Sequence, residues 1–572
     1  MKIVQKGNYS GDIIKTVLEN RNIPNLELFL NPEQALESDP FEFMNSEKGR
    51  SLLFKHLEKG SDISILVDAD ADGYTSSTIM YRYLMDLRSK SKISYIVHDR
   101  KAHGLTDRVM EELAETKPGL VIVPDAGSND IAKIEELEKN GINILIIDHH
   151  VVSEFTDKGV IINNQLCPIT NHQLVGAGVI YKFLQGFDKE YGFNKVDNYL
   201  DLVAVGQIGD SSDISNPEIR KLVLKGLENI KNPFLKVAIG QDLGFVKLTP
   251  KDLSFGVIPM INAVTRVGSM EERELLFEAM AGIGEGRIFA VEKKKKNKDT
   301  GKFDKISLNY NIYEYGYDLC TKAKNRQASV TKKLTPIIEK NMLDCGGIII
   351  AFTGDDEYPG ITGLIANKLV NKYEKPVLLL NETEDSYTGS GRGHEKTIKD
   401  FRKWCENSNL VEFAQGHDNA FGIGIRKDKL DDFKNYSKTL QKTELIYEVD
   451  LITDKPNKDL CEIIDKNRSL FGGSVSEPII GIIGLTVPKR FISVKGQMLT
   501  IWSYGITMIQ FSASNELIDS IFINAPDIFT FNIVGSYSMN NWGGRITPQL
   551  IIKDIEIVFE KEEEINEDNI IF

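Results

Sequence analysis

Short apolar runs alternate with longer stretches of helical periodicity between residues 60 and 210. The runs occupy residues 63–67, 94–97, 120–124, 142–147 and 160–162. Apolar runs of this length that alternate with helices are typical of buried strands in a parallel, doubly wound sheet. The pattern therefore predicts an α/β domain with a parallel sheet in the first half of the chain.

A second α/β pattern occupies residues 345–381, where GGIIIAF, a helix through Lys372 and PVLLL follow one another. This pattern predicts a second, smaller α/β domain. Residues 270–290 are expected to be helical, and residues 326–341 to belong to a helical connector between the two domains. The lysine-rich segment 292–305 is expected to be an exposed loop or a helix extension.

From about Leu445 the chain changes to short strand-like runs separated by turns. The runs are IIGIIGLTV, MLTIWSYGITMIQFSA, SIFINA (520–525), FTFNIVGSY and QLIIKDIEIVF. Their spacing predicts a small β-barrel, for which an OB-fold is the natural candidate. Aromatic residues of a small barrel are more often core, so only one or two of four candidates are expected to stack on bases: Trp502, Tyr504, Tyr537 and Trp542.

Acidic residues and histidines follow three of the apolar runs in the first domain. Asp68, Asp70 and Asp72 follow ISILV, Asp125 follows LVIVP, and Asp148, His149 and His150 follow INILII. Ligands of open α/β sheets bind beyond the carboxyl ends of the strands, so these side chains are expected to converge on one crevice. Crowded carboxylates repel one another unless a hard cation neutralises them. The alternative for the first group alone is a solvated acidic turn.

The residue types indicate which metal such a crevice would hold. An imidazole among carboxylates suits manganese better than calcium, and magnesium remains open. The number of carboxylates predicts two ions, which together would hold a phosphoryl group, activate water and stabilise the leaving oxygen. Adjacent histidines point in different directions, so one of them can ligate a metal while the other faces substrate. Asp210 ends the apolar helical stretch 199–209 and is either a further ligand or a helix-terminal residue.

Composition bounds the class of protein. The formal net charge of -14 counts against nucleic-acid binding as an average, but part of the acid belongs to the candidate metal site and to the tail at 560–568. Five cysteines without a CxxC spacing argue against a disulfide framework or a zinc knuckle. No apolar run of about twenty residues is present to span a membrane, and residues 1–10 lack the apolar core of a signal peptide. A cytoplasmic location is expected.

Four motifs now carry a family resemblance. DADADG, PDAGS, DHH and AVGQIGD, in this order and at these intervals, resemble motifs I to IV of the DHH phosphoesterase superfamily. NPEQALESDPFEF, LVGAGVIYKFL and PMINAVTRVGSM resemble the RecJ single-strand exonucleases. YPGITGLIANKLVNKYEKPVLLL, GSGRG and QGHDNAFG are similar to the DHHA1 domain of RecJ, and LFGGSVSEP and NNWGGRITPQLIIKDI to its OB domain. The likeness therefore extends over nearly the whole chain.

The resemblance implies roles for individual residues. The implied metal ligands are Asp70, Asp72, Asp125, His149 and Asp210, with Asp125 as the bridging carboxylate. The remaining implied catalytic residues are His150, which would contact the scissile phosphate, Asp148, which would support the ligands, and Asp68. The implied substrate-binding residues are Ser390, Arg392 and His417, followed by Asn419 and Arg266. Ala126-Gly127, Gly209-Asp210 and Gln415-Gly416 depart from the usual family pattern and mark a divergent member.

The resemblance also implies an activity. The chain is expected to hydrolyse phosphodiester bonds of single-stranded DNA with two Mn²⁺ or Mg²⁺ ions, from 5′ to 3′, releasing mononucleotides in DNA repair, recombination or replication. Single-stranded DNA is the implied partner, with a helicase or single-strand-binding protein delivering it to a monomer that has no membrane contact. Two alternatives stay open: a DHH-family oligoribonuclease or cyclic-dinucleotide phosphodiesterase, and a non-catalytic replication scaffold built on a DHH core.

Length and the changes in pattern predict several domains. The expected fold is α/β: a parallel-sheet DHH domain and a smaller α/β DHHA1 domain joined by a helical connector, with a C-terminal OB-fold β-barrel. The expected boundaries are 1–48 for an N-terminal arm, 49–290 for the DHH catalytic domain, 291–342 for the connector, 343–440 for the DHHA1 substrate-binding domain, and 441–572 for the OB-fold-like nucleic-acid-binding domain with its acidic tail.

Overall fold

The computed structural model describes residues 1–99, 103–243, 248–296, 301, 303–354, 359–394, 397–440, 446–523, 526–542 and 545–558. Contacts divide the chain into two units, each discontinuous in sequence. One contains residues 31–444 and 472–474, and the other contains residues 1–30, 445–471 and 475–572. The domain boundaries expected from the sequence remain predictions. The expected acidic tail lies outside the described residues.

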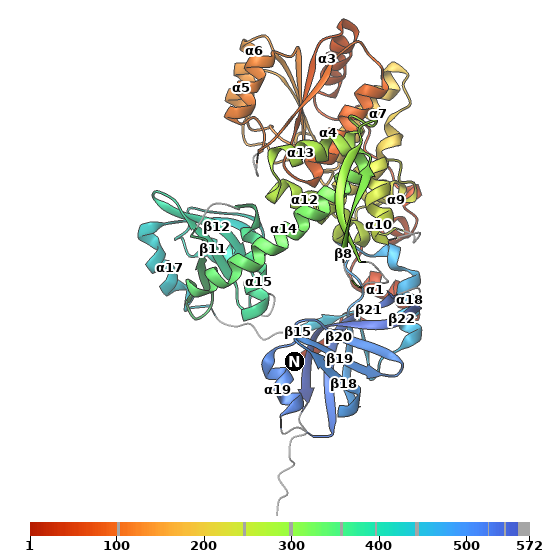
Figure 1. Ribbon diagram of the computed structural model, residues 1–572, viewed down its shortest axis with the longest axis vertical. Helices are drawn as coiled ribbons and strands as arrows, with labels where there is room; N and C mark the ends of the chain where they lie inside the picture. The colour runs from red at the N-terminus through yellow and green to blue at the C-terminus, as the bar shows by residue number, and fades with distance from the viewer. Residues whose placement is uncertain are drawn as a thin grey trace, which may run out of the picture. The chain divides into compact units, whose positions relative to one another are not determined.

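Five parallel strands form the sheet of the first α/β domain (Figure 1). In spatial order they are β3 (Ile93–Val97), β2 (Ile63–Val67), β4 (Leu120–Pro124), β5 (Asn143–Asp148) and β6 (Val160–Asn163). Every residue of β2 and β4 is buried, as expected for central strands of a sheet that helices cover on both faces. The predicted parallel, doubly wound sheet is confirmed.

Helices cover both faces of this sheet. On one face lie α5 (Asp107–Thr116) and α6 (Ile131–Lys139), whose apolar residues share a core with alternate residues of the strands. On the other face lie α3 (Ser46–Lys59), α4 (Ala71–Asp86) and α7 (Gly176–Tyr191). The helix α8 (Leu200–Gly209) packs against α4 and α7. This packing brings the beginning of α4 and the end of α8 to the carboxyl ends of the strands.

Five helices continue the first domain: α9 (Pro217–Glu228), α10 (Pro233–Leu243), α11 (Pro250–Phe255), α12 (Val257–Val267) and α13 (Met270–Ala281). The helix expected over 270–290 is therefore too long. It ends at Ala281 because Gly282 adopts φ 75°, a left-handed conformation that ends a helix and favours glycine.

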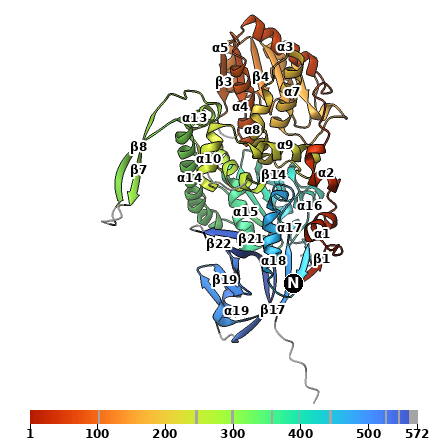
Figure 2. The ribbon, with the colours of Figure 1, turned by 90° about the vertical axis from the view of Figure 1, so that its right-hand side faces the viewer.

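The lysine-rich segment that follows is a two-stranded antiparallel ribbon of β7 (Phe289–Lys296) and β8 (Phe303–Tyr310), visible in Figure 2. The expectation of an exposed loop or helix extension is wrong for these residues. Apolar contacts account for the difference, because Val291, which pairs with Leu308 across the ribbon, is buried, and Phe289 stacks on Tyr315 of the following helix at a centroid distance of 4.2 Å. The run of lysines makes the alternation of buried and exposed positions difficult to recognise in the sequence.

The helical connector is confirmed as α14 (Ile312–Lys340), a single helix of 29 residues. It leads to a six-stranded sheet in the order β13 (Phe413–His417), β14 (Ala420–Arg426), β12 (Ser386–Arg392), β11 (Val377–Glu382), β10 (Ile349–Phe352) and β9 (Leu343–Asp344). The helices of this domain are α15 (Thr362–Tyr373), α16 (Phe401–Asn407) and α17 (Leu430–Ser437). The predicted smaller α/β domain is thus confirmed.

The other unit has the β-rich architecture expected of an OB-like region. Its seven strands are ordered β16 (Leu451–Thr453), β17 (Ile480–Pro488), β21 (Ile528–Trp542), β22 (Arg545–Val558), β20 (Ile506–Gln510), β19 (Met498–Ser503) and β18 (Ile492–Lys495). The helices α1 (Ile13–Asn20), α2 (Leu26–Leu30) and α18 (Lys458–Lys466) belong to the same unit. In addition, β1 (Lys2–Gln5) pairs in parallel with β15 (Ile446–Val449).

One expected strand of this unit is a helix. SIFINA overlaps α19 (Asn515–Phe522), so the strand prediction is wrong for residues 520–522, and Asn524 and Ala525 lie outside the described residues. The side chain of Ser514 accepts a hydrogen bond from the Leu517 N–H at 3.1 Å and caps the helix. Among the described residues, no helix combines the length and apolar character that a membrane span requires.

Candidate active site

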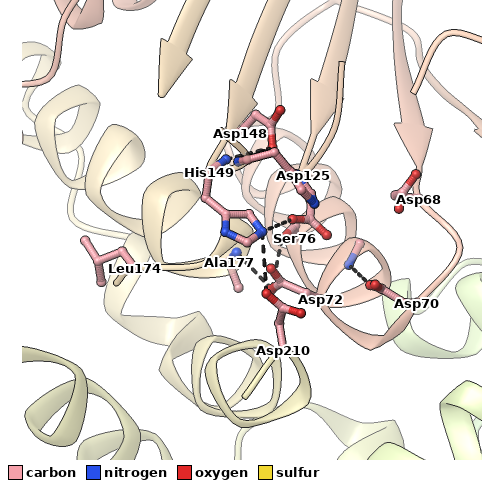
Figure 3. A network of polar contacts seen from close by, with 12 residues as sticks. Asp68, Asp70, Asp72, Ser76, Asp125, Asp148, His149, Leu174, Ala177 and Asp210 are labelled. Atoms are coloured by element: carbon pink, nitrogen blue, oxygen red, sulfur yellow. Dashed lines mark hydrogen bonds and ion pairs between the residues drawn. The ribbon is translucent and has the colours of Figure 1, made fainter. Parts of the chain in front are cut away.

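The carboxyl ends of β2, β4 and β5 meet the first turn of α4 and the last residue of α8 (Figure 3). Asp70 is the N-cap of α4 and accepts a hydrogen bond from the Gly73 N–H at 2.9 Å. Asp72 lies in the first turn of the same helix, and Asp210 directly follows Gly209 as the C-cap residue of α8. The predicted convergence of strand-end side chains is therefore present in the structure.

Asp125 lies at the centre of this region. Its Oδ1 is 3.1 Å from Nε2 of His149, which in turn is 3.6 Å from Oδ2 of Asp210. Asp125 adopts φ 65°, a left-handed conformation that is rare for residues with a side chain and recurs at functional sites. Burial raises the pKa of Asp125 well above its ordinary range, and the charges of Asp72 and other neighbouring aspartates add to this rise.

Asp72 is buried with only part of its hydrogen-bonding capacity used. Its Oδ1 accepts a hydrogen bond from the Ala177 N–H at 3.0 Å, whereas Oδ2 has no hydrogen-bond partner among the described residues. Burial, followed by the charges of Asp210 and Asp70, raises the pKa of Asp72 to about 8. Buried carboxylate oxygens without donors, crowded by like charges, fit the coordination chemistry of a hard divalent cation.

The two adjacent histidines face different partners, as predicted. The His149 side chain is 15% exposed and points to Asp125, whereas that of His150 is 56% exposed and places Nδ1 2.8 Å from Oδ1 of Asp148. Burial lowers the pKa of His149 to about 4, and the charge of His150 acts in the same direction. The hydrogen bond to Asp148 raises the pKa of His150 to about 9 despite its partial burial.

Asp148 supports the two histidines through hydrogen bonds. It accepts hydrogen bonds from the backbone N–H groups of His149 at 2.7 Å and Ser128 at 3.1 Å, in addition to the contact with His150. Burial alone would raise the pKa of Asp148, but the hydrogen bond and charge of His150 and the hydrogen bond from Ser128 hold it below its ordinary value. These contacts favour the ionised form of Asp148.

Asp68 lies to the side of the cluster and has its own histidine partners. Its Oδ2 is 2.6 Å from Nδ1 of His103, and its Oδ1 is 3.7 Å from Nε2 of His98 and 3.4 Å from the Gly104 N–H nitrogen. Burial raises the pKa of Asp68, whereas the hydrogen bond to His103 opposes this rise.

Among the described residues, two groups of side chains lie close enough to hold a metal ion. In each group, one potential ligand atom of every residue lies within 4.8 Å of those of the others. The first group is Asp125, Asp148, His149 and His150, and the second is Asp68, Asp70 and Asp125. Asp125 belongs to both groups, as a bridging carboxylate would.

Several residues that shape the site were not among the predicted ones. A Cβ on Gly176 would lie 2.4 Å from Oδ1 of Asp125, and a Cβ on Gly206 would lie 2.4 Å from Oδ1 of Asp72. The side chain of Asn262 accepts a hydrogen bond from the Ala71 N–H at 3.1 Å and fixes the beginning of α4. All three lie within motifs that carry the family resemblance, but their roles could not be read from the motifs, because these roles depend on packing between distant helices.

His98 and His103 were also missed, although a signal was available. Both follow the predicted strand at 94–97, just as the aspartates follow the neighbouring strands. The expectation that ligands gather at the carboxyl ends of parallel strands applies equally to them. Both lie outside the motifs that carry the family resemblance.

The predicted substrate-binding residues of the smaller domain lie on β12, on β13 and in the turn between β13 and β14. Ser390 and Arg392 alternate on β12 and therefore share a face, where Oγ of Ser390 is 3.2 Å from Oγ1 of Thr362 at the start of α15. Arg392 lies so close to Gly363 that a Cβ there would be 2.4 Å from its Nη2.

Arg266 of α12 approaches the same place. A Cβ on Gly360 would lie 3.2 Å from Cβ of Arg266. Burial lowers the pKa of Arg266 and of Arg392, and for Arg392 the charge of Arg266 contributes. Two partly buried guanidinium groups that repel each other favour an anion between them, because the anion relieves the repulsion, just as the acidic cluster favours a cation.

His417 and Asn419 differ in their surroundings. His417 is exposed at the end of β13, and its charge opposes the rise in the pKa of Asp210, which burial and Asp70 bring to about 6. Both ends of the Asn419 side chain are hydrogen-bonded to backbone, to the Lys399 carbonyl at 2.7 Å and the Phe401 N–H at 3.3 Å. A substrate contact by Asn419 would require exchange of these bonds.

The four aromatic candidates of the OB-like unit separate into two kinds. Trp502 and Tyr504 are exposed, whereas Tyr537 is buried and its hydroxyl accepts a hydrogen bond from the Asn457 N–H at 2.8 Å. The candidate role in base stacking is therefore wrong for Tyr537, which belongs to the core. The side chain of Trp542 lies outside the described residues.

The parallel sheet and its strand-end carboxylates and histidines define a DHH-type domain, and the model of the DHH family, N-terminal domain, matches residues 62–207. The chain is 30% identical, over 99% of both sequences, to "Putative SPbeta prophage-derived single-strand DNA-specific exonuclease YorK" of Bacillus subtilis. It therefore belongs to the RecJ-like family of the DHH superfamily, which includes YorK.

Two further comparisons agree with this assignment. The chain is 23% identical to the single-stranded-DNA-specific exonuclease RecJ of Bacillus subtilis, over 95% of this chain and 68% of that protein. The crystal structure of RecJ from Thermus thermophilus in complex with Mn²⁺ superposes with a TM-score of 0.71 at 17% identity, covering 97% of this chain and 79% of the other. At this identity the superposition establishes the shared fold.

Proposed function

We propose that this chain is an exonuclease that hydrolyses phosphodiester bonds of single-stranded DNA with two divalent ions. The names of its relatives over nearly the full chain, YorK and RecJ, support this proposal. The observation that carries it is the position of Asp125, which belongs to both groups of potential metal ligands. A carboxylate shared between two adjacent ions is a feature of two-metal phosphodiester chemistry.

The residues present fit such ions. Asp70, Asp72, Asp125, His149 and Asp210 would hold Mn²⁺ or Mg²⁺, and the imidazole among carboxylates favours Mn²⁺. When bound, such ions polarise the scissile phosphate and activate water for attack. Within the chain, the Ala177 N–H orients Asp72, and Asp148 holds the ring of His150 so that its exposed edge faces the substrate. His150 would then stabilise charge on the phosphate.

The substrate strand would be held by the smaller domain. Ser390, Arg392 and Arg266 would contact its phosphates, since the neighbouring guanidinium groups favour an anion between them. His417 would approach the strand close to Asp210. The family resemblance alone supports three further parts of the proposal. These are cleavage from 5′ to 3′, release of mononucleotides, and delivery of substrate by a helicase or single-strand-binding protein.

Digestion of end-labelled oligonucleotides with Mn²⁺, with each end blocked in turn, tests this proposal. A long single strand should be shortened from its 5′ end to mononucleotides, and blocking that end should stop the reaction. Cleavage of dinucleotides or cyclic dinucleotides with no activity on the long strand would favour a DHH-family oligoribonuclease or cyclic-dinucleotide phosphodiesterase. Binding of single strands without any shortening would favour a replication scaffold.

Replacement of Arg392 by alanine tests the role of the smaller domain. The Arg392→Ala variant should raise KM about tenfold or more for a single strand while kcat changes little, because a contact made equally in the ground and transition states is lost. Steady-state kinetics on a labelled oligonucleotide measures both constants. A fall in kcat at unchanged KM would contradict a role confined to capture of the strand.

A further inference from the structure

We propose that His103 is a second substrate-contacting imidazole, which binds a non-bridging phosphate oxygen of the single strand on the β2–β3 side of the metal cluster. This inference rests on the proposed function and deepens it. It assigns a role to a residue that no motif of the chain singles out.

The geometry repeats that of His150. In both cases a buried aspartate at the end of a parallel strand contacts Nδ1 of a half-exposed histidine. For His150 the partner is Asp148 after β5, and for His103 it is Asp68 after β2, at 2.8 Å and 2.6 Å respectively. The two histidine side chains are 56% and 50% exposed, whereas the two aspartates are almost fully buried. Each aspartate thus fixes one edge of a ring whose other edge, carrying Nε2, faces away from it.

The two pairs lie on opposite sides of the shared aspartate. The strand order is β3-β2-β4-β5-β6, so β4, which precedes Asp125, separates the strand before Asp68 from the strand that ends at Asp148. At the usual spacing of neighbouring strands, the ends of β2 and β5 are about 10 Å apart. One phosphate cannot span two imidazoles at this separation. His103 would therefore contact the phosphate next to the one that faces His150.

The backbone around His103 holds the ring in place. The Gly104 N–H is directed at Asp68, and the Leu105 N–H donates a hydrogen bond to Oδ2 of Asp130 at 2.7 Å. Gly104 adopts φ 65°, and a Cβ there would lie 2.2 Å from Asp130, so only glycine fits. Helix α5 begins three residues later, capped by Thr106. A binding group whose following backbone is fixed in this way is preorganised for its ligand.

The position also places a bound phosphate beside the candidate metal site. Asp68 has one carboxylate oxygen within 4.8 Å of those of Asp70 and Asp125, so the ring of His103 lies one hydrogen bond away from the cluster. A phosphate held there would contact both the imidazole and the region where metal ions would bind. Imidazole N–H groups bound to a carboxylate on one side and to phosphate on the other form charge-assisted hydrogen bonds.

The binding test uses the full-length chain in an Asp125→Ala background, where the strand is held without being cut. Oligonucleotides with a single methylphosphonate linkage, which replaces a charged oxygen by a methyl group, are scanned through the first linkages from the 5′ end. His103→Ala should weaken binding of the unmodified strand about tenfold. At one linkage, the methylphosphonate should weaken binding to the parent protein by a similar factor. The same modification should not weaken binding to His103→Ala any further, because the effects of two groups in direct contact are not additive.

Matched variants distinguish a direct contact between His103 and phosphate from an indirect role in which His103 only supports Asp68. His103→Gln, which keeps a hydrogen-bond donor, should recover part of the affinity. His172→Ala, at an exposed histidine whose Nε2 lies 2.8 Å from the Cys167 carbonyl, should bind like the parent. Losses of affinity that add at every linkage, or unchanged affinity in His103→Ala, would show that His103 only supports Asp68 and would overturn the inference. Thermal unfolding checks that each variant is folded.

The two proposals fail in different ways. Binding to modified strands decides the role of His103 and needs no cleavage. Cleavage by the chain with native Asp125 decides the proposed function. A protein that binds single strands through His103 but never shortens them would retain this inference and lose the exonuclease, and a protein that binds no single strand would lose both.

Discussion

At the scale of single residues, identical side chains acquire different chemistry from their surroundings. His149 and His150 are neighbours with ring centroids 4.5 Å apart, yet the pKa of one falls to about 4 and that of the other rises to about 9. Burial disfavours charge on His149, whereas the ionised Asp148 favours it on His150. A neutral imidazole is suited to bind a metal and a charged one to bind phosphate.

Asp125→Asn is the sharpest test of the metal cluster. Asparagine keeps the shape and the left-handed backbone but removes the charge shared by the two groups of ligands. Cleavage of a single strand with Mn²⁺ should fall about a hundredfold or more. Mutation of a residue that only supports a metal ligand already lowers metal affinity or activity about 10–100-fold, and Asp125 is a proposed ligand itself. Affinity for the strand should change little. Retention of most activity would show that the metal assignment is wrong.

Gly176→Ala tests whether the missed glycine shapes the site. A methyl group 2.4 Å from Oδ1 of Asp125 must displace that carboxylate, so cleavage should fall strongly while the protein stays folded. The matched control is Gly240→Ala, because a Cβ at that helical position meets nothing within 4 Å. This control should gain roughly 0.5–1 kcal/mol of stability and keep its activity. Kinetics and chemical denaturation of both variants provide the comparison.

At the scale of elements, a buried ionic network ties the segment before α3 to two helices. Nζ of Lys182 on α7 is fully buried and lies 2.7 Å from Glu37 and 2.9 Å from Glu218 of α9. Lys221 also contacts Glu37, at 3.0 Å. Two carboxylates therefore share one buried ammonium group, and Glu37 has Lys221 as a second partner. Removing that group leaves charge uncompensated, which is costlier than losing the pair as a whole.

This network predicts how stability depends on pH. Burial raises and Lys182 lowers the pKa of Glu37, with a net fall from 4.5 to about 2. A lowered carboxylate pKa stabilises the fold above pH 4.5, and the contribution disappears as the pH falls through about 2. The free energy of unfolding should therefore decline more steeply between these values in the parent than in Glu37→Gln. Lys182→Met should cost about 3–5 kcal/mol at neutral pH. Denaturant titrations at several pH values measure both effects.

At the scale of the whole molecule, the two ends of the chain build one unit. β1 pairs with β15, and the guanidinium of Arg21 binds both carboxylate oxygens of Asp450, at 2.8 Å and 2.6 Å. Asp450 is almost fully buried. These contacts join residues that are more than four hundred positions apart, so the OB-like unit is complete only when the first thirty residues have joined it.

Arg21→Ala tests this long-range association. Loss of the guanidinium leaves Asp450 buried and unpaired, which should destabilise the OB-like unit by about 3 kcal/mol or more. Hydrogen exchange should become faster in residues 446–449, the strand that pairs with β1, and remain unchanged in β2 and β4. Equal exchange in β15 of the variant and the parent would show that the first residues do not stabilise this unit.

The sequence alone determined the parallel sheet and the place of its site. The apolar runs are short, continuous and buried on both faces, so their pattern does not depend on what packs against them, and the ends of parallel strands must share an edge. Tertiary structure decided what local pattern cannot encode. The ribbon at 289–310 and the helix at 515–522 have patterns that more than one element satisfies, and contacts across the chain select one of them. The roles of Gly176 and Asn262, and the union of residues 1–30 with the C-terminal strands, likewise exist only once distant segments are in contact.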